Sequence, residues 1–136
     1  MKELILEATV DNLEKVMEFI DAELEQHDCP VKTQMRIDVA VEELFVNIAN
    51  YAYAPGAGNA EIRIDFQNKP AAAVITFSDS GKPFDPLAKE DPDVTLSVEE
   101  RKIGGLGIFM VKKSMDDVRY EYKDGKNNLT IVKNLF

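Results

Sequence analysis

The feature of this sequence that most constrains its fold is a nearly continuous apolar run from Ala71 to Ser78. A run of this kind is typical of a central strand, which is buried on both of its faces. The segment before it, from Ala60 to Gln67, alternates apolar with charged residues, and its apolar positions are Ile62, Ile64 and Phe66. This period of two predicts a strand with one buried face. The two segments and the short turn between them therefore predict two strands of a sheet.

The rest of the chain divides into helices, further strands and one long loop. Residues 4–8 read as a short strand, and Asp11 with Glu14 resembles a capping box that opens a helix reaching about His27. Pro30 suits the first turn of a second helix, because its missing amide is not needed there, and this helix runs to about Tyr53. The later elements are a loop over residues 79–103, a helix over 104–114, and strands over 118–123 and 129–135. The order β-α-α-β-β-loop-α-β-β predicts an α+β two-layer sandwich, in which three helices cover one face of a mostly antiparallel five-stranded sheet.

Length and charge exclude several classes of protein. The 136 residues contain no internal repeat and no linker, so we expect one domain over residues 1–136. Twenty-five acidic against sixteen basic residues give a net charge of −9, which disfavours direct binding to nucleic acid or to anionic membranes. Cys29 and His27 are the only residues of their types, which excludes a disulfide framework and a zinc site of clustered Cys or His. No stretch approaches the roughly 18 apolar residues of a membrane span, and we expect a soluble, cytoplasmic protein.

The first candidate site lies on the second predicted helix, where Glu43, Asn47 and Asn50 share one stripe and apolar residues cover the opposite arc. One interpretation is the ordinary solvent-facing side of an amphipathic helix. Against it, two of the three residues are amides, which are poorer helix formers than Lys or Glu. A carboxylate beside an amide oxygen suits a Mg²⁺ ion and a proton acceptor, since Mg²⁺ prefers one or two protein oxygens, water and substrate phosphates.

The second candidate site follows the apolar strand directly, at Asp79-Ser80-Gly81. It can be a plain turn that uses Gly81 for a positive φ. It can also be functional, with an acid at the edge of the sheet that accepts a hydrogen bond from a buried amine. In that interpretation Gly81 lets the backbone approach a flat ring.

The third candidate site is Gly104-Gly105-Leu106-Gly107, which leads into an apolar helix. Glycines at a helix start leave amides exposed, and with the helix dipole these amides form a phosphate cradle. The alternative is a hinge followed by a closely packed helix start, but three glycines in four positions carry an entropic cost that packing rarely requires. The motif is neither a Walker P-loop nor a dinucleotide fingerprint, because no Gly-Lys-Ser/Thr follows and no strand directly precedes it.

In this order along the chain, the three sites resemble the N box and the two glycine boxes of the GHKL superfamily of ATPases and kinases. The sequence is most similar to the anti-sigma-factor serine/threonine protein kinases, because residues 79–86 look like their first glycine box and residues 104–107 like their second. The similarity extends over essentially the whole chain. It implies a Bergerat-type fold, with an ATP site between the helices and the sheet of a single kinase domain.

The resemblance also implies roles for individual residues. Asn47 would bind the Mg²⁺ ion that bridges the phosphates of ATP, Glu43 would be the general base, and Asp79 would accept a hydrogen bond from the adenine amino group. Gly81 would line the adenine pocket, and Gly105 and Gly107 would hold the phosphates with the backbone of Leu106. Further cofactor contacts are implied for Asn50, Pro83, Phe84, Gly104, Ile108 and Asn128.

A mobile lid over about residues 84–103 is also implied, in which Arg101 or Lys102 would close over the phosphates. Two positions depart from the superfamily pattern. Pro83 stands where a second glycine is usual and stiffens the start of the lid. Asn127-Asn128 stand where a threonine near the last strand often helps to bind adenine, which affects the detail of the adenine contact.

For function, the resemblance implies an ATP-dependent serine/threonine kinase with an anti-anti-sigma protein as substrate, a sigma factor as captive partner, a role in transcription regulation, and a homodimer. An alternative is a non-catalytic module of the same fold, in which ATP orders the lid and the lid grips a partner. Retention of Glu43 beside Asn47 favours catalysis, because a binder needs the metal ligand but not the base. The catalytic domain of a histidine kinase is a weaker interpretation, and an α+β domain without a ligand must explain three coincident motifs.

Overall fold

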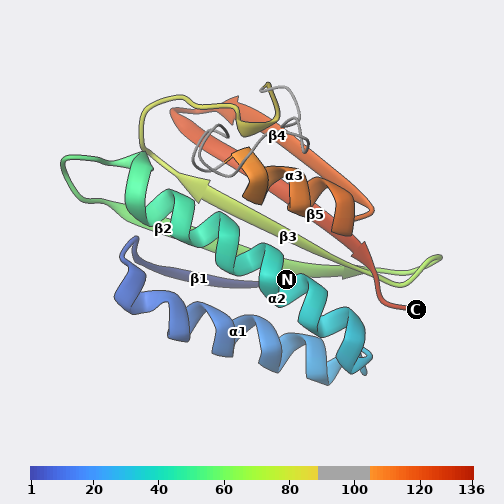
Figure 1. The fold of residues 1–136 in the computed structure, drawn as a ribbon. Helices are drawn as coiled ribbons and strands as arrows, with labels where there is room; N and C mark the ends of the chain where they lie inside the picture. Colours follow the sequence, from blue (N-terminus) through green and yellow to red (C-terminus); the bar gives the residue numbers. More distant parts are fainter. Residues whose placement is uncertain (89–104) are drawn as a thin grey trace.

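The computed structural model of the chain describes residues 1–88 and 105–136, and its secondary structure follows the predicted order. The strands are β1 (Lys2–Glu7), β2 (Asn59–Gln67), β3 (Ala72–Asp79), β4 (Asp117–Lys123) and β5 (Lys126–Asn134), and the α-helices are α1 (Leu13–Gln26), α2 (Val31–Asn47) and α3 (Gly105–Ser114). A 3₁₀ turn over Pro86–Ala88 is the one regular element in the described part of the predicted lid. Figure 1 shows these elements along the chain.

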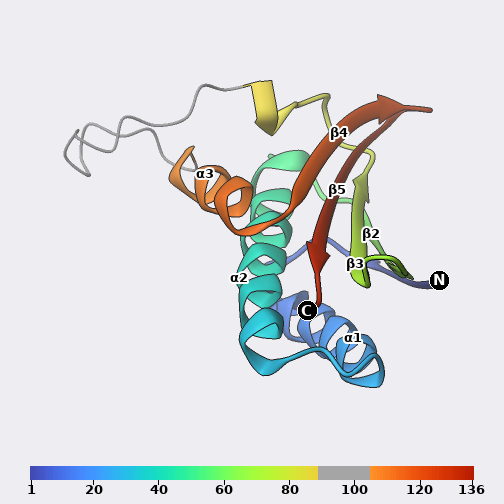
Figure 2. The same ribbon diagram turned by 90° about the vertical axis from the view of Figure 1, so that its right-hand side faces the viewer.

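The strands form one sheet in the order β1-β2-β3-β5-β4, and every neighbouring pair is antiparallel. The apolar run therefore forms the central strand, as predicted. The three helices of the described residues lie together on one face of this sheet, which Figure 2 shows edge-on. The predicted fold class, an α+β two-layer sandwich, is confirmed.

The core lies between the helices and the sheet, because the apolar faces of both layers are buried against each other. Its largest fully buried side chains are Phe45, Phe77, Ile20, Leu24, Ile37, Ile62, Ile64, Ile75 and Ile131. Burial of each apolar side chain of this size contributes about 1.5–3 kcal/mol. The alternation predicted for β2 is confirmed, since Ile62 and Ile64 are buried.

The opposite face of the sheet is covered by polar side chains instead of helices. Arg63 Nη2 donates to Ser78 Oγ (3.0 Å), and Ser78 donates to Asn128 Oδ1 (2.6 Å). Lys126 Nζ lies 2.9 Å from Glu61 Oε1 on the same face. These side chains bury Ser78 completely. The central strand is thus buried on the helix face and partly buried on the polar face, where Val74 and Thr76 are half-buried.

Two predicted helix starts differ from the structure. The capping box at Asp11 is wrong: Asp11 lies in a 3₁₀ turn, and the N-cap of α1 is Asn12, whose side chain makes no capping hydrogen bond. Asn12 Nδ2 donates instead to the carbonyl oxygen of Glu7 (2.8 Å), which ties the helix start to β1. Pro30 is the N-cap of α2, one residue before the expected first turn.

The end of the second helix and the start of the last strand also differ in detail. α2 continues as a π-helical turn over Ile48–Ala52, with Tyr53 as its C-cap, so the predicted end is confirmed but the last turn is wider. β5 begins at Lys126 and not at Leu129. The positive φ angles of Asp124 (56°) and Gly125 (76°) form a tight turn, which brings the two strands into register earlier.

Among the residues that the structure describes, no helix is long and apolar enough to cross a membrane.

Candidate functional site

The first site pair, Glu43 and Asn47, lies on one face of α2, four residues apart as the spacing predicted. Asn47 Nδ2 donates to Glu43 Oε1 at 3.3 Å, and both side chains are partly buried. Because the amide nitrogen points to Glu43, the amide oxygen of Asn47 is the atom left for a ligand. A carboxylate and an amide oxygen are both hard donors, which fit a Mg²⁺ ion that also keeps water and phosphate ligands.

The glycine-rich start of α3 packs directly against this pair. A methyl carbon added to Gly107 would overlap Cδ and Oε1 of Glu43 and stand 2.8 Å from its Oε2. Only a glycine therefore allows the first turn of α3 and the Glu43 carboxylate to lie this close. The first amides of a helix have no intrahelical partner, and the helix dipole favours an anion beside them. The first and third candidate sites thus form one continuous surface.

The second candidate site is fixed at the end of β3. Asp79 is buried, with 7% of its surface exposed, and its Oδ1 accepts from the backbone N–H of Gly81 (2.9 Å). A methyl carbon at Gly81 would overlap the carbonyl oxygen of Ala52 and stand 2.7 Å from its carbonyl carbon. The next N–H, of Lys82, donates to the same carbonyl oxygen of Ala52 (3.3 Å). The turn after Asp79 is therefore seated on the end of the helix that carries Glu43.

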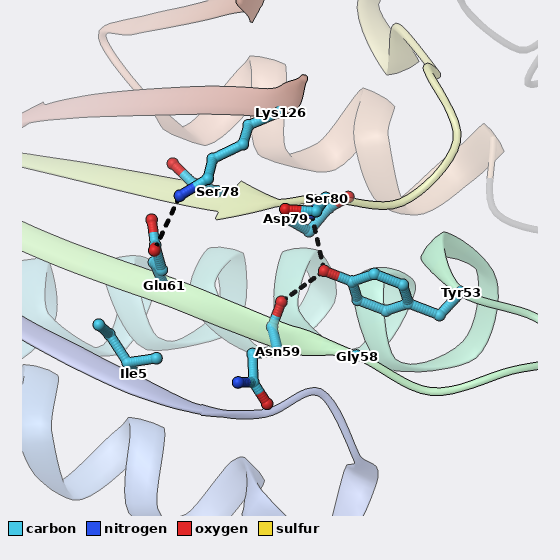
Figure 3. Close-up of a pocket in the computed structure, with 9 residues that line it drawn as sticks. All are labelled: Ile5, Tyr53, Gly58, Asn59, Glu61, Ser78, Asp79, Ser80 and Lys126. Carbon is cyan, nitrogen blue, oxygen red and sulfur yellow. Dashed lines mark hydrogen bonds and ion pairs between the residues drawn. The ribbon is translucent and has the colours of Figure 1, made fainter. Parts of the chain in front are cut away.

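Tyr53 joins these segments and was missed by the sequence analysis. Its hydroxyl donates to the carbonyl oxygen of Asn59 (2.6 Å) and accepts from the N–H of Ser80 (2.7 Å). Figure 3 shows this bridge beside a pocket of about 320 Å³ on the polar face of the sheet, close to the Glu61–Lys126 ion pair. No signal in the sequence distinguishes Tyr53 from an ordinary aromatic residue at a helix end.

The two asparagines of β5 lie on opposite faces of the sheet. Asn127 is buried beside Asp79, its register partner, and its Nδ2 donates to Asp79 Oδ1 (3.0 Å). Asn128 lies on the polar face, where it accepts from Ser78 and donates to the carbonyl oxygens of Glu121 (3.4 Å) and Lys126 (3.1 Å). Asn127, and not the predicted Asn128, is therefore the residue next to Asp79.

The other predicted residues divide between the site and its surroundings. Asn50 is exposed within the π-helical turn, and Pro83 and Phe84 are exposed after the turn at Gly81. Gly105, Leu106 and Ile108 lie in the first turn of α3 with Gly107. Arg101, Lys102, Gly104 and residues 89–103 of the predicted lid lie outside the described residues.

Burial raises the pKa values of the Tyr120 hydroxyl, beside Asp79, and of the Asp38 carboxyl group, away from the site. Burial, together with the negative charges of Asp85 and Asp79, raises the pKa of Tyr120, so its hydroxyl stays protonated and donates to Asn127 Oδ1. Away from the site, between α1 and α2, burial and the neighbouring Asp21 raise the pKa of Asp38 to about 8. Asp38 therefore keeps its proton at neutral pH.

Known proteins resemble this chain in sequence and in fold. The sequence matches the model of a family described as histidine kinase-like ATPase domain over residues 6–133. It is 24% identical over 101 residues to the serine/threonine-protein kinase BtrW of Bordetella bronchiseptica, which covers 74% of this chain and 70% of that kinase. It is 30% identical over 93 residues to the serine-protein kinase RsbW of Listeria monocytogenes, which covers 65% of this chain and 59% of that kinase.

The fold is similar to that of a crystal structure of the RsbU and RsbW domains of Rv1364c from Mycobacterium tuberculosis. The TM-score is 0.63 at 14% sequence identity, over 99% of this chain and 33% of that chain. The matched regions thus span only part of the length of each of these proteins.

Proposed function

This chain belongs to the family of histidine kinase-like ATPase domains, and we propose that it is an ATP-dependent serine/threonine protein kinase that acts as an anti-sigma regulatory factor. It phosphorylates an anti-anti-sigma protein and, in its other state, holds a sigma factor. The observation that carries the proposal is the packing of Gly107 against the Glu43 carboxylate, which unites a base, a metal ligand and a helix start. The names of the two bacterial kinases that it resembles support the same activity.

In this proposal the last turns of α2 and the π-helical turn after it position both ends of the nucleotide. Asp79 accepts a hydrogen bond from the adenine amino group, and the backbone at Gly81, which has no side chain, lies against the ring. The amides of Gly105 and Gly107 bind the phosphates at the start of α3. The short contacts of Gly81 with Ala52, and of Gly107 with Glu43, support this division because both tie a glycine motif to the same helical segment.

The amide oxygen of Asn47 is the protein ligand for Mg²⁺. When bound, ATP would supply the phosphoryl group and Mg²⁺ would neutralise its charge, so the protein contributes mainly positioning and electrostatic stabilisation. The Asn47 amide N–H also occupies Oε1 of Glu43. The second carboxylate oxygen, Oε2, then takes the proton of the substrate hydroxyl. An ionised carboxylate is available for this at neutral pH.

Transfer of labelled phosphate tests the proposal. The chain is incubated with γ-labelled ATP, Mg²⁺ and each anti-anti-sigma protein encoded in the same genome, with Glu43→Gln as the matched variant. We expect transfer to a serine or threonine of one of these proteins, and loss of transfer in the variant. If ATP tightens the binding of a partner but no phosphate moves, the non-catalytic module is the better interpretation. If the chain binds no ATP, both fail.

A further inference from the structure

The carboxamide of Asn127 makes hydrogen bonds with three segments of the chain. Its Nδ2 donates to Asp79 Oδ1 (3.0 Å) and to the carbonyl oxygens of Lys82 (3.0 Å) and Gly81 (3.5 Å). Its Oδ1 accepts from the backbone N–H of Phe84 (3.1 Å) and from the Tyr120 hydroxyl. Only 8% of the residue is exposed. A buried asparagine with this many hydrogen bonds holds the segments that it contacts in place relative to one another.

These partners determine which way the amide group points. Three acceptor oxygens surround the nitrogen, and the Phe84 N–H can only donate. A reversed amide would place its oxygen against the Asp79 carboxylate and two carbonyls, and its NH₂ against the Phe84 N–H. The observed orientation is therefore the stable one, and Asn127 is a donor toward Asp79.

The orientation of Asn127 limits how Asp79 can bind a ligand. The N–H of Gly81 and the amide of Asn127 both donate to Oδ1 of this carboxylate. Oδ1 is thus satisfied within the protein, and Oδ2 is left to accept a hydrogen bond from outside it. An oxygen held in this way accepts from an amino group and repels a carbonyl oxygen, which makes it a selector between two kinds of base.

We propose that Asn127 is a positioning residue for base selection: it aims Oδ2 of Asp79 at an exocyclic amino group, and it ties the backbone from Gly81 to Phe84 to the same carboxylate. This inference rests on the proposed function, because it takes Asp79 as the acceptor of the adenine amino group. A threonine hydroxyl has one proton and cannot donate to Asp79 while also donating to Lys82. The amide therefore couples base selection to the position of the following turn.

The test uses the full chain, Asn127→Ala, Asn127→Asp and, as a matched control in β5, Thr130→Val. Thr130 bonds to the hydroxyl of Thr76 (3.1 Å), so the control loses one side-chain hydrogen bond of the same strand outside the site. Calorimetry measures the dissociation constants of ATP and of inosine triphosphate, which carries a carbonyl in place of the amino group. Backbone hydrogen exchange at Gly81 and Phe84 is measured without nucleotide.

We expect the unsubstituted chain and Thr130→Val to prefer ATP by tenfold or more. Asn127→Ala is expected to weaken ATP binding by about tenfold, as for a lost hydrogen bond to a charged group, to reduce the preference below about threefold, and to speed exchange at Phe84. An Asn127→Ala protein that keeps the preference, or that keeps slow exchange at Phe84, overturns the inference and leaves the kinase proposal intact. Absence of ATP binding by the unsubstituted chain overturns both.

Asn127→Asp distinguishes a positioning role of Asn127 from a general effect on folding. It also keeps the inference testable if Asn127→Ala does not fold. At pH 7.5 its carboxylate cannot donate to Asp79, so ATP binding is expected to be weak. Burial and the adjacent Asp79 carboxylate raise the pKa of the introduced carboxyl group, so near pH 5.5 it regains a proton and can donate again. We expect its ATP affinity, relative to that of the unsubstituted chain, to recover as the pH falls. A constant ratio between the two proteins across this range overturns the inference.

Discussion

Substitution of Gly107 by alanine tests the contact on which the candidate site depends. Alanine has a higher helix propensity than glycine, and this alone would stabilise α3 by about 0.5–1 kcal/mol. The added methyl group, however, would overlap the carboxylate of Glu43, so this side chain must rotate away. When the Glu43 side chain rotates, it loses the hydrogen bond from Asn47 and its carboxylate leaves the N-terminus of α3. The two losses together lower the free energy of unfolding by about 1–3 kcal/mol.

The two opposing effects can be separated by a double-mutant cycle. In the unsubstituted background we expect Gly107→Ala to change the free energy of unfolding by between about 0 and −2.5 kcal/mol. In a Glu43→Ala background the obstacle is absent, so the same substitution should stabilise by about 0.5–1 kcal/mol. The coupling between the two sites is then about 1–3 kcal/mol, well above the 0.3–0.5 kcal/mol or so of independent sites. Urea unfolding of the four proteins measures it.

Gly107→Ala should also remove activity without removing the fold. Because the carboxylate of Glu43 is displaced, we expect phosphoryl transfer to fall by about 10²-fold or more, as for a misplaced general base. The single variant should unfold cooperatively and with an unchanged denaturant slope. Additive effects on stability in the cycle, together with normal transfer, would refute the contact between Glu43 and α3.

Three further substitutions test the remaining parts of the site and of the fold. Glu43→Gln should leave nucleotide affinity within about threefold, under about 1 kcal/mol, and lower transfer by about 10²–10⁴-fold; unchanged transfer means that Glu43 is not the base. Asp79→Asn should lose ATP binding, because it leaves a mismatched polar group in a buried position. On the unsubstituted chain, GTP should compete poorly with ATP. Equal competition by GTP and ATP removes Asp79 from the adenine site. The pKa of Asp38 is about 8 in the folded chain and 3.8 in the unfolded chain. The free energy of unfolding therefore falls as the pH rises between these two values. Asp38→Asn should flatten this decline in urea unfolding at pH 5, 7 and 9, and a parallel decline in both proteins contradicts the assignment.

The fold could be predicted because its periodic patterns are strong and agree with one another. The run from Ala71 to Ser78 predicted a central strand, and the register of β3 between β2 and β5 confirms it. The helix starts were less predictable, because several residues compete for the same backbone groups. Asn12 bonds to the carbonyl oxygen of Glu7 and leaves the N-terminal amides of α1 without a side-chain cap. Local cap signals cannot show that a preceding strand will attract the side chain.

Within the candidate site, the spacing along one helix was informative and the contacts between elements were not. The four-residue interval placed Glu43 and Asn47 on one face, and their hydrogen bond confirms that geometry. The approach of Gly107 to Glu43 depends on how α3 packs on α2, which no local pattern specifies. Glycines in a motif indicated that something lies close to the backbone. In this chain the neighbour at Gly107 is a protein carboxylate.

The choice between Asn127 and Asn128 depended on where the last strand begins. Leu129 and Ile131 face the helices, and a period of two therefore puts Asn127 on the same face and Asn128 on the other. The pattern was present in the sequence, but a strand expected to begin at Leu129 offers no reason to extend it backwards. The tight turn at Asp124-Gly125 starts β5 at Lys126 and makes the extension valid. A shift of one residue along a strand exchanges its two faces. The position of a two-residue turn thus decides which asparagine stands beside Asp79.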